Sequence, residues 1–390
     1  MISVSEARER LFALIEPLEQ EEVPLREAAG RVLAQDVMAQ RDQPPFAASS
    51  MDGYALNGVE ADLHAQFKVI GEAAAGHGFS GKVGAGCAVR IFTGAPMPDG
   101  TDFVVIQEDV TRQGDVISIS EDPNGKSNVR PAGGDFTKGT TIHAPRRLRP
   151  QDVALLASMN IPRVPVTRKP IVALISTGDE LVMPGQTPGP DQIIASNTFG
   201  LHAIVEALGA TPRLLPIARD TRASLTTCFD MARGADLVVT VGGASVGDHD
   251  LVGEVAQSLG MERAFYKIAM RPGKPLMAGR MGDAAMLGLP GNPVSAMVCG
   301  YLFLAPMLRR MLGEVETVPA LRQARLAQDL GQNGPREHYM RAMVDGDQVT
   351  AFDNQDSSLL TVLAQANALL VRAPHDPPRR AGDTVTYLPL

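Results

Sequence analysis

The region between residues 171 and 259 alternates apolar strand patterns with helical patterns. The strand patterns lie at residues 171–176, 214–218 and 237–241, and the helical patterns at 198–208, 221–233 and 250–259. Strands that alternate with helices of this length form βαβ units and a parallel sheet. Such sheets bind ligands at the carboxyl ends of their strands. We therefore expect an α/β domain with a functional site at that edge.

Other patterns flank this region on both sides. Ser3 and Glu6 form a capping box before a helix that reaches about residue 16, and residues 25–37 have a second helical pattern. Residues 67–120 carry short strand patterns between glycine-rich turns, and a helical pattern returns at residues 148–159. The patterns predict a segmented helical domain (1–45 and 139–168), an inserted β domain (46–138), the α/β domain (169–314) and a C-terminal β domain (315–390).

Composition excludes several classes of function. The net charge is −8, so the chain lacks the positive field that proteins need to bind nucleic acid backbones. It has no tryptophan and only 4% aromatic residues, which leaves little for stacking on bases. The three cysteines are far apart and odd in number, so neither a disulfide framework nor a zinc site is expected.

Neither a signal peptide nor a membrane span is expected. The N-terminal residues lack the apolar core of a signal peptide, and the apolar stretch at residues 294–308 is shorter than the roughly 20 residues that a bilayer requires. We expect a cytoplasmic protein that contacts no membrane and whose cysteines stay reduced.

Two neighbouring segments predict an anion site. Residues 265–276 have the pattern of a strand, a cationic turn and a second strand, and the turn carries Lys267, Arg271 and Lys274. At residues 288–294 a Gly/Pro loop opens a helix, with Asn292 suited to the N-cap and Pro293 to the first helical turn. Cationic side chains and free helix-start N–H groups together favour a small anionic ligand. The alternative, an ordinary loop with solvated lysines, stays open for either segment alone.

Carboxylates follow three of the predicted strands and indicate a magnesium site. Glu180, Asp220 and Asp250 occur at these strand ends. Mg²⁺ takes one or two protein oxygens and keeps places for water and substrate phosphate, which suits such an edge. Glycines at 242, 243 and 247 would let backbone N–H groups approach a phosphate. Asp220 and Asp250 could instead be ordinary helix N-caps.

The Gly-Ala-Ser-Val-Gly run at residues 243–247 also matches the G-x-S-x-G nucleophile turn of serine hydrolases. A hydrolase would need a histidine downstream of Ser245. His249 is too close in sequence, and His338 and His375 belong to the C-terminal β domain. This hypothesis is the main competing enzyme function.

Six segments together resemble the molybdopterin molybdenumtransferase family, which includes bacterial MoeA and the gephyrin E domain. The segments are Ser-Met-Asp-Gly-Tyr-Ala at 50–55, Thr-Gly-Ala-Pro-Met-Pro at 93–98, Ser-Thr-Gly-Asp-Glu-Leu at 176–181, Gly-Gly-Ala-Ser-Val-Gly at 242–247, Pro-Gly-Lys-Pro at 272–275 and Gly-Leu-Pro-Gly-Asn-Pro-Val-Ser at 288–295. They occur in the family's order across essentially the whole chain.

The resemblance implies a multidomain fold. It consists of a segmented helical domain with an inserted β domain, an α/β molybdopterin-binding domain with a parallel sheet, and a C-terminal β-barrel. It also implies a homodimer with shared active sites and a Mg²⁺-dependent reaction, in which molybdate is inserted into adenylylated molybdopterin and AMP is released. A molybdopterin adenylyltransferase upstream, and cofactor-maturation proteins or molybdoenzymes downstream, are the implied partners.

The resemblance also assigns roles to individual residues. The implied catalytic carboxylates are Asp52, Glu180, Asp220 and Asp250, of which the last three are the implied metal ligands. The implied substrate or oxyanion contacts are Thr93, Arg130, Asp135, Gly242, Gly243, Ser245, Gly247, Lys267, Arg271, Lys274, Pro290, Pro293, Arg341 and Ser357. Arg271 stands where the family often has lysine, and Pro131 and Ala132 stand where it often has arginine.

Two further alternatives share the whole family fold or its α/β domain alone. The chain could be a scaffold that keeps the fold without catalysis, although its acidic and cationic sets are intact. It could instead adenylylate molybdopterin, but the three additional domains argue against that activity.

Overall fold

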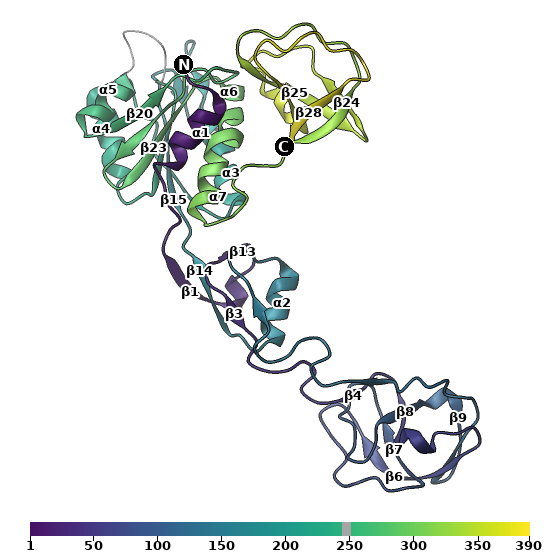
Figure 1. Cartoon of the computed structure of the whole chain (residues 1–390). Helices are drawn as coiled ribbons and strands as arrows, with labels where there is room; N and C mark the ends of the chain where they lie inside the picture. Colours follow the sequence, from purple (N-terminus) through teal and green to yellow (C-terminus); the bar gives the residue numbers. More distant parts are fainter. Residues whose placement is uncertain (244–250) are drawn as a thin grey trace.

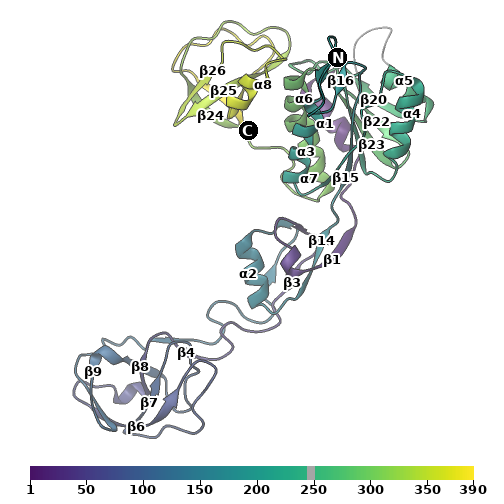
Figure 2. The same cartoon turned by 180° about the vertical axis from the view of Figure 1, so that it is seen from behind.

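The computed structural model describes residues 1–243 and 251–390. The chain is elongated, with an α/β body and a C-terminal barrel beside each other at one end (Figure 1). A small middle body connects them to a distal β body at the other end, and the view from behind shows the same arrangement (Figure 2). The multidomain α/β plus all-β class predicted from the sequence is confirmed, whereas the domain limits stay predictions.

The distal body is built on one six-stranded sheet. Its strands lie in the order β8 (Phe103–Ile106), β5 (Gly53–Leu56), β7 (Cys87–Ile91), β6 (Gln66–Ala73), β10 (Val116–Ile119) and β9 (Val110–Gln113). Successive side chains of a strand point to opposite faces. In β5, Tyr54 and Leu56 therefore enter one core and Ala55 enters another. The predicted inserted β fold is thus stabilised on both faces of its sheet.

The middle body contains four paired strands, β1 (Gln20–Pro24), β14 (Arg163–Thr167), β2 (Val32–Leu33) and β13 (Arg146–Arg147), with helix α2 (Pro150–Ser158). The helix predicted at residues 25–37 is wrong. The segment forms a short 3-10 turn, η1 (Leu25–Glu27), and then strands β2 and β3 (Val37–Met38). Gly30 has a φ of 76°, which interrupts a helix, and its N–H donates to the Leu148 carbonyl.

The N-terminal helix α1 (Val4–Phe12) begins as predicted, since the Ser3 side chain accepts a hydrogen bond from the Glu6 N–H. It ends at Phe12, short of residue 16. Its buried residues Val4, Ala7 and Leu11 belong to the core of the α/β body. The apolar face of this helix therefore packs against the α/β sheet, although the predicted domain limits place the helix in the segmented domain.

The α/β body has a six-stranded sheet in the order β18 (Thr211–Leu214), β15 (Ile171–Ser176), β19 (Leu237–Val241), β23 (Ala284–Leu289), β22 (Met277–Met281) and β20 (Glu262–Tyr266). The first four strands are parallel to one another, β22 is antiparallel to β23, and β20 is antiparallel to β22. All five residues of β19 are buried. Helices cover both faces of this sheet, which explains its continuous apolar strands.

The strand predicted at residues 214–218 ends earlier than expected, at Leu214. The segment still follows β15, because the Leu215 N–H donates to the Leu174 carbonyl and the Ala218 N–H to that of Ser176. Pro216 has no N–H with which to continue the ladder.

Helices α1, α3 (Asn197–Ala207), α6 (Pro293–Cys299) and α7 (Ala305–Met311) cover one face of the sheet, and α4 (Arg222–Met231) and α5 (Leu251–Ser258) cover the other (Figures 1 and 2). A π-helical turn, η4 (Gly300–Leu304), joins α6 to α7. No helix in the described parts of the chain has both the length and the apolar character that a bilayer crossing needs.

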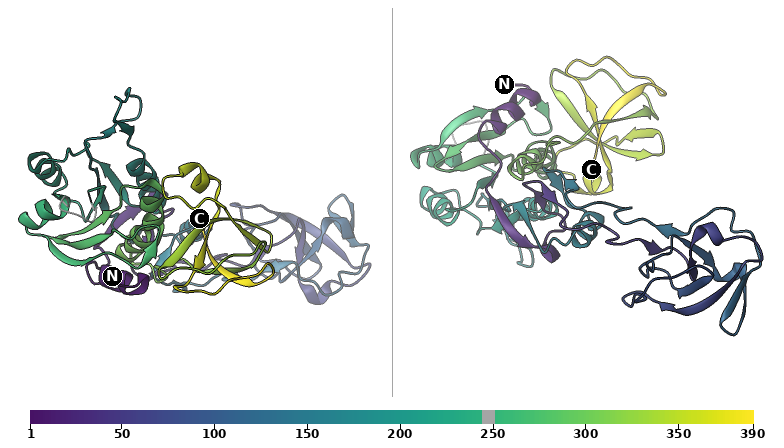
Figure 3. Two further views of the ribbon diagram at one scale, coloured as in Figure 1. Left: turned by 90° about the horizontal axis from the view of Figure 1, so that it is seen from above. Right: turned by 60° about the horizontal axis from the view of Figure 1, so that its bottom comes forward.

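The C-terminal strands close into the predicted barrel. The ring runs through β25 (Glu337–Asp345), β26 (Gln348–Ala351), β24 (Arg322–Leu326), β28 (Thr384–Pro389) and β27 (Ala368–Arg372), and the pairing of β25 with β27 closes it. Strand β21 (Met270–Arg271) of the α/β body adds to β25 in parallel. The barrel is thereby attached directly to the predicted cationic turn, and Figure 3 shows the two bodies side by side.

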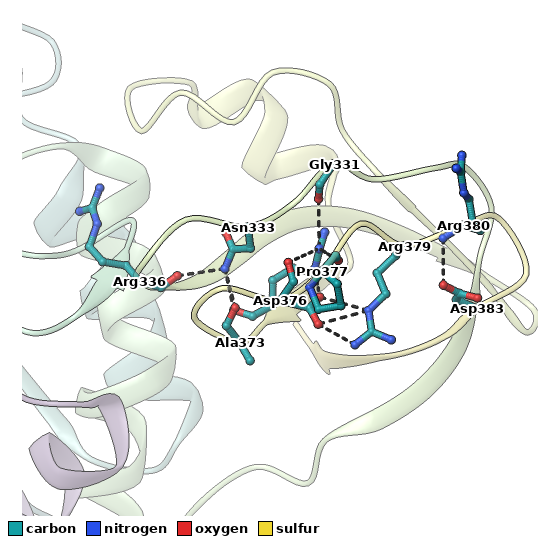
Figure 4. Close-up of polar contacts among 10 residues, drawn as sticks. Gly331, Asn333, Arg336, Ala373, Asp376, Pro377, Arg379, Arg380 and Asp383 are labelled. Carbon is teal, nitrogen blue, oxygen red and sulfur yellow. Dashed lines mark hydrogen bonds and ion pairs between the residues drawn. The ribbon is translucent and has the colours of Figure 1, made fainter.

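A polar network fixes the barrel loops next to this junction (Figure 4). Asp376 receives hydrogen bonds from Arg372 and Arg379, and Asn333 donates to the Arg336 and Ala373 carbonyls. Arg336 in turn donates to the Met270 carbonyl of β21, at 3.3 Å. The network therefore sets where β25 begins beside the α/β body.

Candidate functional site

A pocket of about 1000 Å³ lies at the carboxyl ends of the parallel strands. Its walls come from the loops after β15, β19 and β23 and from the start of α3. The chain leaves β15 toward β18 on one side and later returns to β19 on the other. The pocket thus occupies the point where the strand order reverses, which is where open α/β sheets bind ligands.

Glu180 lies in this pocket, on the turn after β15. The turn depends on Gly178, which has a φ of 147°. A Cβ atom at this position would lie 2.3 Å from Oε2 of Glu180. The carboxylate therefore folds back over a residue that has no side chain, and glycine is required for this geometry.

Asp220 lines the same pocket. The N-cap of α4 is Thr221, whose hydroxyl accepts a hydrogen bond from the Ser224 N–H at 3.3 Å. Asp220 instead uses its own N–H to donate to Oδ1 of Asp179, at 3.2 Å. The alternative interpretation of Asp220 as a helix cap is wrong, and its carboxylate is available to the pocket.

The glycine-rich loops after β19 and β23 approach each other closely. Gly242 has a φ of 99°, and a Cβ atom there would lie 2.5 Å from the Thr177 carbonyl oxygen. A Cβ atom at Gly291 would lie 3.5 Å from the Gly242 Cα. Gly242, Gly243, Pro290 and Pro293 all line the pocket. Ser245, Gly247 and Asp250 lie outside the described residues.

Lys267 and Lys274 belong to one tight loop beside the pocket. The Lys267 N–H donates to the Leu276 carbonyl at 2.9 Å, and the Ile268 N–H donates to that of Lys274 at 3.0 Å. The Lys267 ammonium lies 4.9 Å from the centroid of the Tyr266 ring. Pro275 lines the pocket, whereas the two lysines are not among its lining residues. The loop therefore places Lys274 at the rim, next to Pro275, whereas the Lys267 ammonium lies over the Tyr266 ring.

Arg271 faces the barrel, where β21 places it opposite His338. Arg341 on β25 is fully buried, and its Nη2 donates to the Asp356 carbonyl at 2.9 Å. Its Nε and Nη1 have no hydrogen-bond partner among the described residues. Burial lowers the pKa of Arg341, and the Arg271 charge lowers it further. A buried cation with unused donors is a strong anion-binding group.

His338 belongs to the same cluster. Its Nε2 is buried and has no hydrogen-bond partner in the described part of the chain. Burial, followed by the charges of Arg271 and Arg341, lowers the pKa of His338 to about 4. The imidazole is therefore neutral near pH 7, and the cluster takes its positive charge from the arginines.

Ser357 links the barrel to the start of α6. Its hydroxyl accepts a hydrogen bond from Asn292 Nδ2 at 2.9 Å, and its carbonyl accepts one from the Val294 N–H at 3.0 Å. Asn292 and Pro293 hold the positions predicted for them, but the Asn292 side chain makes no capping bond. The expectation of free helix-start N–H groups is thus wrong for Val294, because the barrel already uses that donor.

Four of the predicted site residues belong to the inserted β domain, and they are distant from this pocket within one chain. Thr93 donates to Asp52 through its N–H and its hydroxyl, both at 2.8 Å, and these bonds lower the pKa of Asp52. Arg130 lies on β11 (Val129–Arg130), paired with β4 (Ala48–Ser49), and the Asp135 N–H donates to the Gln43 carbonyl. The first three therefore belong to the distal body, which lies at the other end of the molecule from the α/β body (Figures 1 and 2), whereas Asp135 precedes Phe136, which is in the core of the middle body.

Sequence reasoning missed several residues of the pocket. Ile193 and Ile194 line it from strand β17, Asn197 from the start of α3, and Ser358 from the barrel. Asn197 Nδ2 donates to the Gly291 carbonyl at 2.7 Å, which links two pocket walls. Two consecutive isoleucines after a Pro/Gly-rich stretch were the available signal, but short apolar pairs are common in sequences.

The donor set of the pocket fits Mg²⁺ rather than a metal held entirely by protein. Among the described residues, no three His, Cys, Asp or Glu side chains come together as a metal site. Glu180 and Asp220 bring two carboxylates from neighbouring strand ends into one cavity. Mg²⁺ commonly binds to one or two carboxylates together with water and substrate phosphate.

The hydrolase alternative finds no support in the described residues. Ser245 lies outside them, and His338 is enclosed by arginines with its Nε2 unpaired. A catalytic histidine needs a partner that orients it, and a serine to deprotonate.

Comparisons with known proteins agree with the geometry. Three family models match: "MoeA N-terminal region (domain I and II)" at residues 2–160, "Probable molybdopterin binding domain" at 173–310, and "MoeA C-terminal region (domain IV)" at 323–390. A molybdopterin molybdenumtransferase of Haemophilus influenzae is 33% identical, and the match covers 100% of this chain and 98% of the relative. One from Nostoc is 35% identical over 95% of this chain and 90% of the relative.

Solved structures give the same result. A molybdopterin biosynthesis MoeA protein from Pyrococcus horikosii superposes with a TM-score of 0.86 at 30% identity, covering 100% of this chain and 99% of that one. A second MoeA structure, from Pyrococcus horikoshii OT3, gives 0.85 at 27% identity with full coverage of both chains. The chain belongs to the molybdopterin molybdenumtransferase family.

Proposed function

We infer that this chain is a molybdopterin molybdenumtransferase that inserts molybdate into adenylylated molybdopterin and releases AMP. The observation that carries the inference is one pocket lined by Glu180 and Asp220, together with a buried arginine, Arg341, whose Nη2 binds the Asp356 carbonyl two residues before the pocket-lining Ser358. Cleavage of a phosphoanhydride needs positive charge on the leaving phosphate, and a molybdate dianion needs cationic hydrogen-bond donors. The two requirements correspond to the two parts of this site.

Glu180 and Asp220 would hold Mg²⁺, together with Asp250 if that carboxylate reaches the same place. When bound, the ion supplies positive charge to the leaving phosphate. The Gly242 N–H already donates to the Leu289 carbonyl at 3.1 Å, so other N–H groups of the two glycine-rich loops would contact the phosphate oxygens.

The oxyanion site is proposed at the junction of the α/β body and the barrel. Arg341 would supply positive charge to this site from its buried position, where its Nε and Nη1 lack partners among the described residues. Arg271 and Lys274 would add charge from the α/β side, and Ser357 a hydroxyl from the barrel. Lys267 would then contribute long-range attraction, since its ammonium lies over the Tyr266 ring.

A complete site would need a second chain. Asp52 and Thr93 lie next to strands β5 and β7 of the distal body, which is at the opposite end of the molecule from the α/β body that carries Glu180 (Figure 1). A two-fold dimer would bring one chain's distal body, with Arg130, and its Asp135 over the partner's pocket. We propose a homodimer with two shared sites.

Mixed dimers test the shared site. Asp52→Ala and Glu180→Ala chains, each inactive alone, are unfolded together and refolded. With shared sites, each mixed dimer has one site with both lesions and one with neither, so random pairing restores about a quarter of the sites. Sites built within single chains would each keep one lesion, and mixing would then restore no activity.

The enzyme itself is tested with purified protein, adenylylated molybdopterin, Mg²⁺ and molybdate, with AMP release as the readout. Release that depends on molybdate supports the proposed activity. AMP release that is absent, with tight substrate binding retained, would favour a scaffold. In the cell, a molybdopterin adenylyltransferase would supply the substrate, and cofactor-maturation proteins or molybdoenzymes would take the product. We propose that the protein acts in the cytoplasm.

A further inference from the structure

The pocket lacks aromatic side chains among its described lining residues. The proposed substrate nevertheless carries two flat heterocycles, adenine and the pyrimidine ring of the pterin. Flat rings bind most strongly where one face leaves water and packs against an apolar surface. In this pocket, aliphatic side chains must supply that surface.

Ile193 and Ile194 are the most exposed of the large apolar residues in the pocket wall. They form strand β17 (Ile193–Ile194), and their exposed fractions are 59% and 39%. Strand β17 pairs in parallel with β16 (Leu181–Val182), apart from the main sheet. We refer to Ile193 and Ile194 as the isoleucine shelf.

The isoleucine shelf is attached directly to the segment that carries Glu180. The Ile193 N–H donates to the Glu180 carbonyl at 2.8 Å, and the Ala195 N–H donates to the Val182 carbonyl at 2.9 Å. Arg219 Nη1 donates to the Asp179 and Leu181 carbonyls, at 3.0 and 3.2 Å. A ring on the shelf would therefore be held at a fixed place relative to the Glu180 turn.

The connection between the two strands is also ordered by its own hydrogen bonds. Met183 and Gln186 close one turn, in which the Met183 N–H donates to the Gln186 side chain and the Gln186 N–H to the Met183 carbonyl. Gly189 and Gln192 close a second turn in the same reciprocal way. The shelf thus does not depend on a ligand for its shape.

We propose that the isoleucine shelf packs against a flat heterocycle of the substrate and thereby sets specificity for it. The proposal rests on the proposed function, because it takes the adenylylated pterin as the ligand. Adenine and pterin share the chemistry that the shelf recognises, so the test separates them. The shelf acts in binding and has no role in bond cleavage.

The test compares Ile193→Ser and Ile194→Ser with the wild type and with Leu259→Ser. Leu259 is a matched control, since it is 39% exposed, lies in the same body and is not among the pocket-lining residues. Calorimetry measures Kd for AMP and, separately, for molybdopterin, with Mg²⁺ present. Steady-state assays of AMP release give KM and kcat, and Ile193→Val tests rescue by a conservative change.

We expect each shelf variant to weaken the binding of one of the two ring ligands about tenfold, because serine leaves much less apolar surface to cover the face of the ring. KM should rise to a similar extent with kcat within about twofold, and Ile193→Val should bind nearly as the wild type does. The ligand that weakens identifies the ring.

Unchanged Kd for both ligands in both variants would overturn the proposal, as would an equal loss of affinity in Leu259→Ser. A lower kcat at constant KM would overturn it too, because it would indicate that the shelf only supports Glu180. Loss of the dimer on gel filtration without any change in Kd would assign the shelf to a second copy of the chain. If the wild type binds AMP but does not produce AMP from the adenylylated substrate, the proposed activity is refuted. The Kd measurements would still test the role of the isoleucine shelf.

Discussion

His338 offers a quantitative test of the buried cationic cluster. Burial and the surrounding arginines lower its pKa from 6.5 to about 4. The folded chain therefore binds this proton less readily than the unfolded chain. The stability contributed by neutral His338 is fully present above about pH 6.5 and is lost as the pH falls toward 4.

The size of this effect follows from the two pKa values. The full difference corresponds to roughly 3 kcal/mol, and about 2 kcal/mol of it should be lost between pH 7.5 and pH 5. The His338→Gln variant cannot take up this proton. Its free energy of unfolding should therefore fall by about 2 kcal/mol less than that of the wild type over the same pH range.

The direct assay is an NMR titration of chains with ¹³C-labelled histidine Cε1. The resonance that disappears in His338→Gln should keep the shift of a neutral ring down to pH 5. His375→Gln serves as the control, since His375 is an exposed residue of the same barrel. A midpoint at pH 6 or above for His338 would contradict both the burial of the cluster and the effect of its arginines.

Two further substitutions test the pocket and its rim. Gly178→Ala should reduce AMP release at least tenfold by displacing the Glu180 carboxylate. The control is Gly260→Ala, where φ is 92° and no atom lies within 4 Å of the added Cβ, so this variant should lose only the stability that the backbone strain costs. Equal activity in the two variants would refute the Glu180 geometry. Lys274→Ala should weaken substrate binding more at about 10 mM salt than at about 1 M, because salt screens a charge at the rim. The control Lys169→Ala removes an exposed lysine just before β15, at the other end of the strand from the pocket, and should bind as the wild type does. A loss of affinity that does not depend on salt would exclude the electrostatic role.

The sequence predicted best those elements whose local pattern agrees with their packing. Strand β15 and strand β19 match the predicted residues 171–176 and 237–241 in full, because burial on both faces makes their sequences continuously apolar. The helix predicted at residues 25–37 was wrong for the opposite reason. There, long-range pairing of β2 with β13 and β14 outweighs a local helical pattern.

Parts of the site depend on contacts that no local pattern shows. The burial of Arg341 and its two unpaired donors arise only when the barrel packs beside Arg271. The use of the Val294 N–H by Ser357 likewise joins residues that are distant in sequence. The Glu180 and Asp220 positions were accessible from the sequence, because the ends of parallel strands share one edge of a sheet.

The most direct test of the proposed activity is the stoichiometry of one reaction, in which AMP and pterin-bound molybdenum are measured together. Wild-type protein with adenylylated molybdopterin, Mg²⁺ and molybdate should form the two products in equal amounts, and Glu180→Gln should form both far more slowly. AMP released at the same rate without molybdate, or without molybdenum on the pterin, would contradict the proposed transfer.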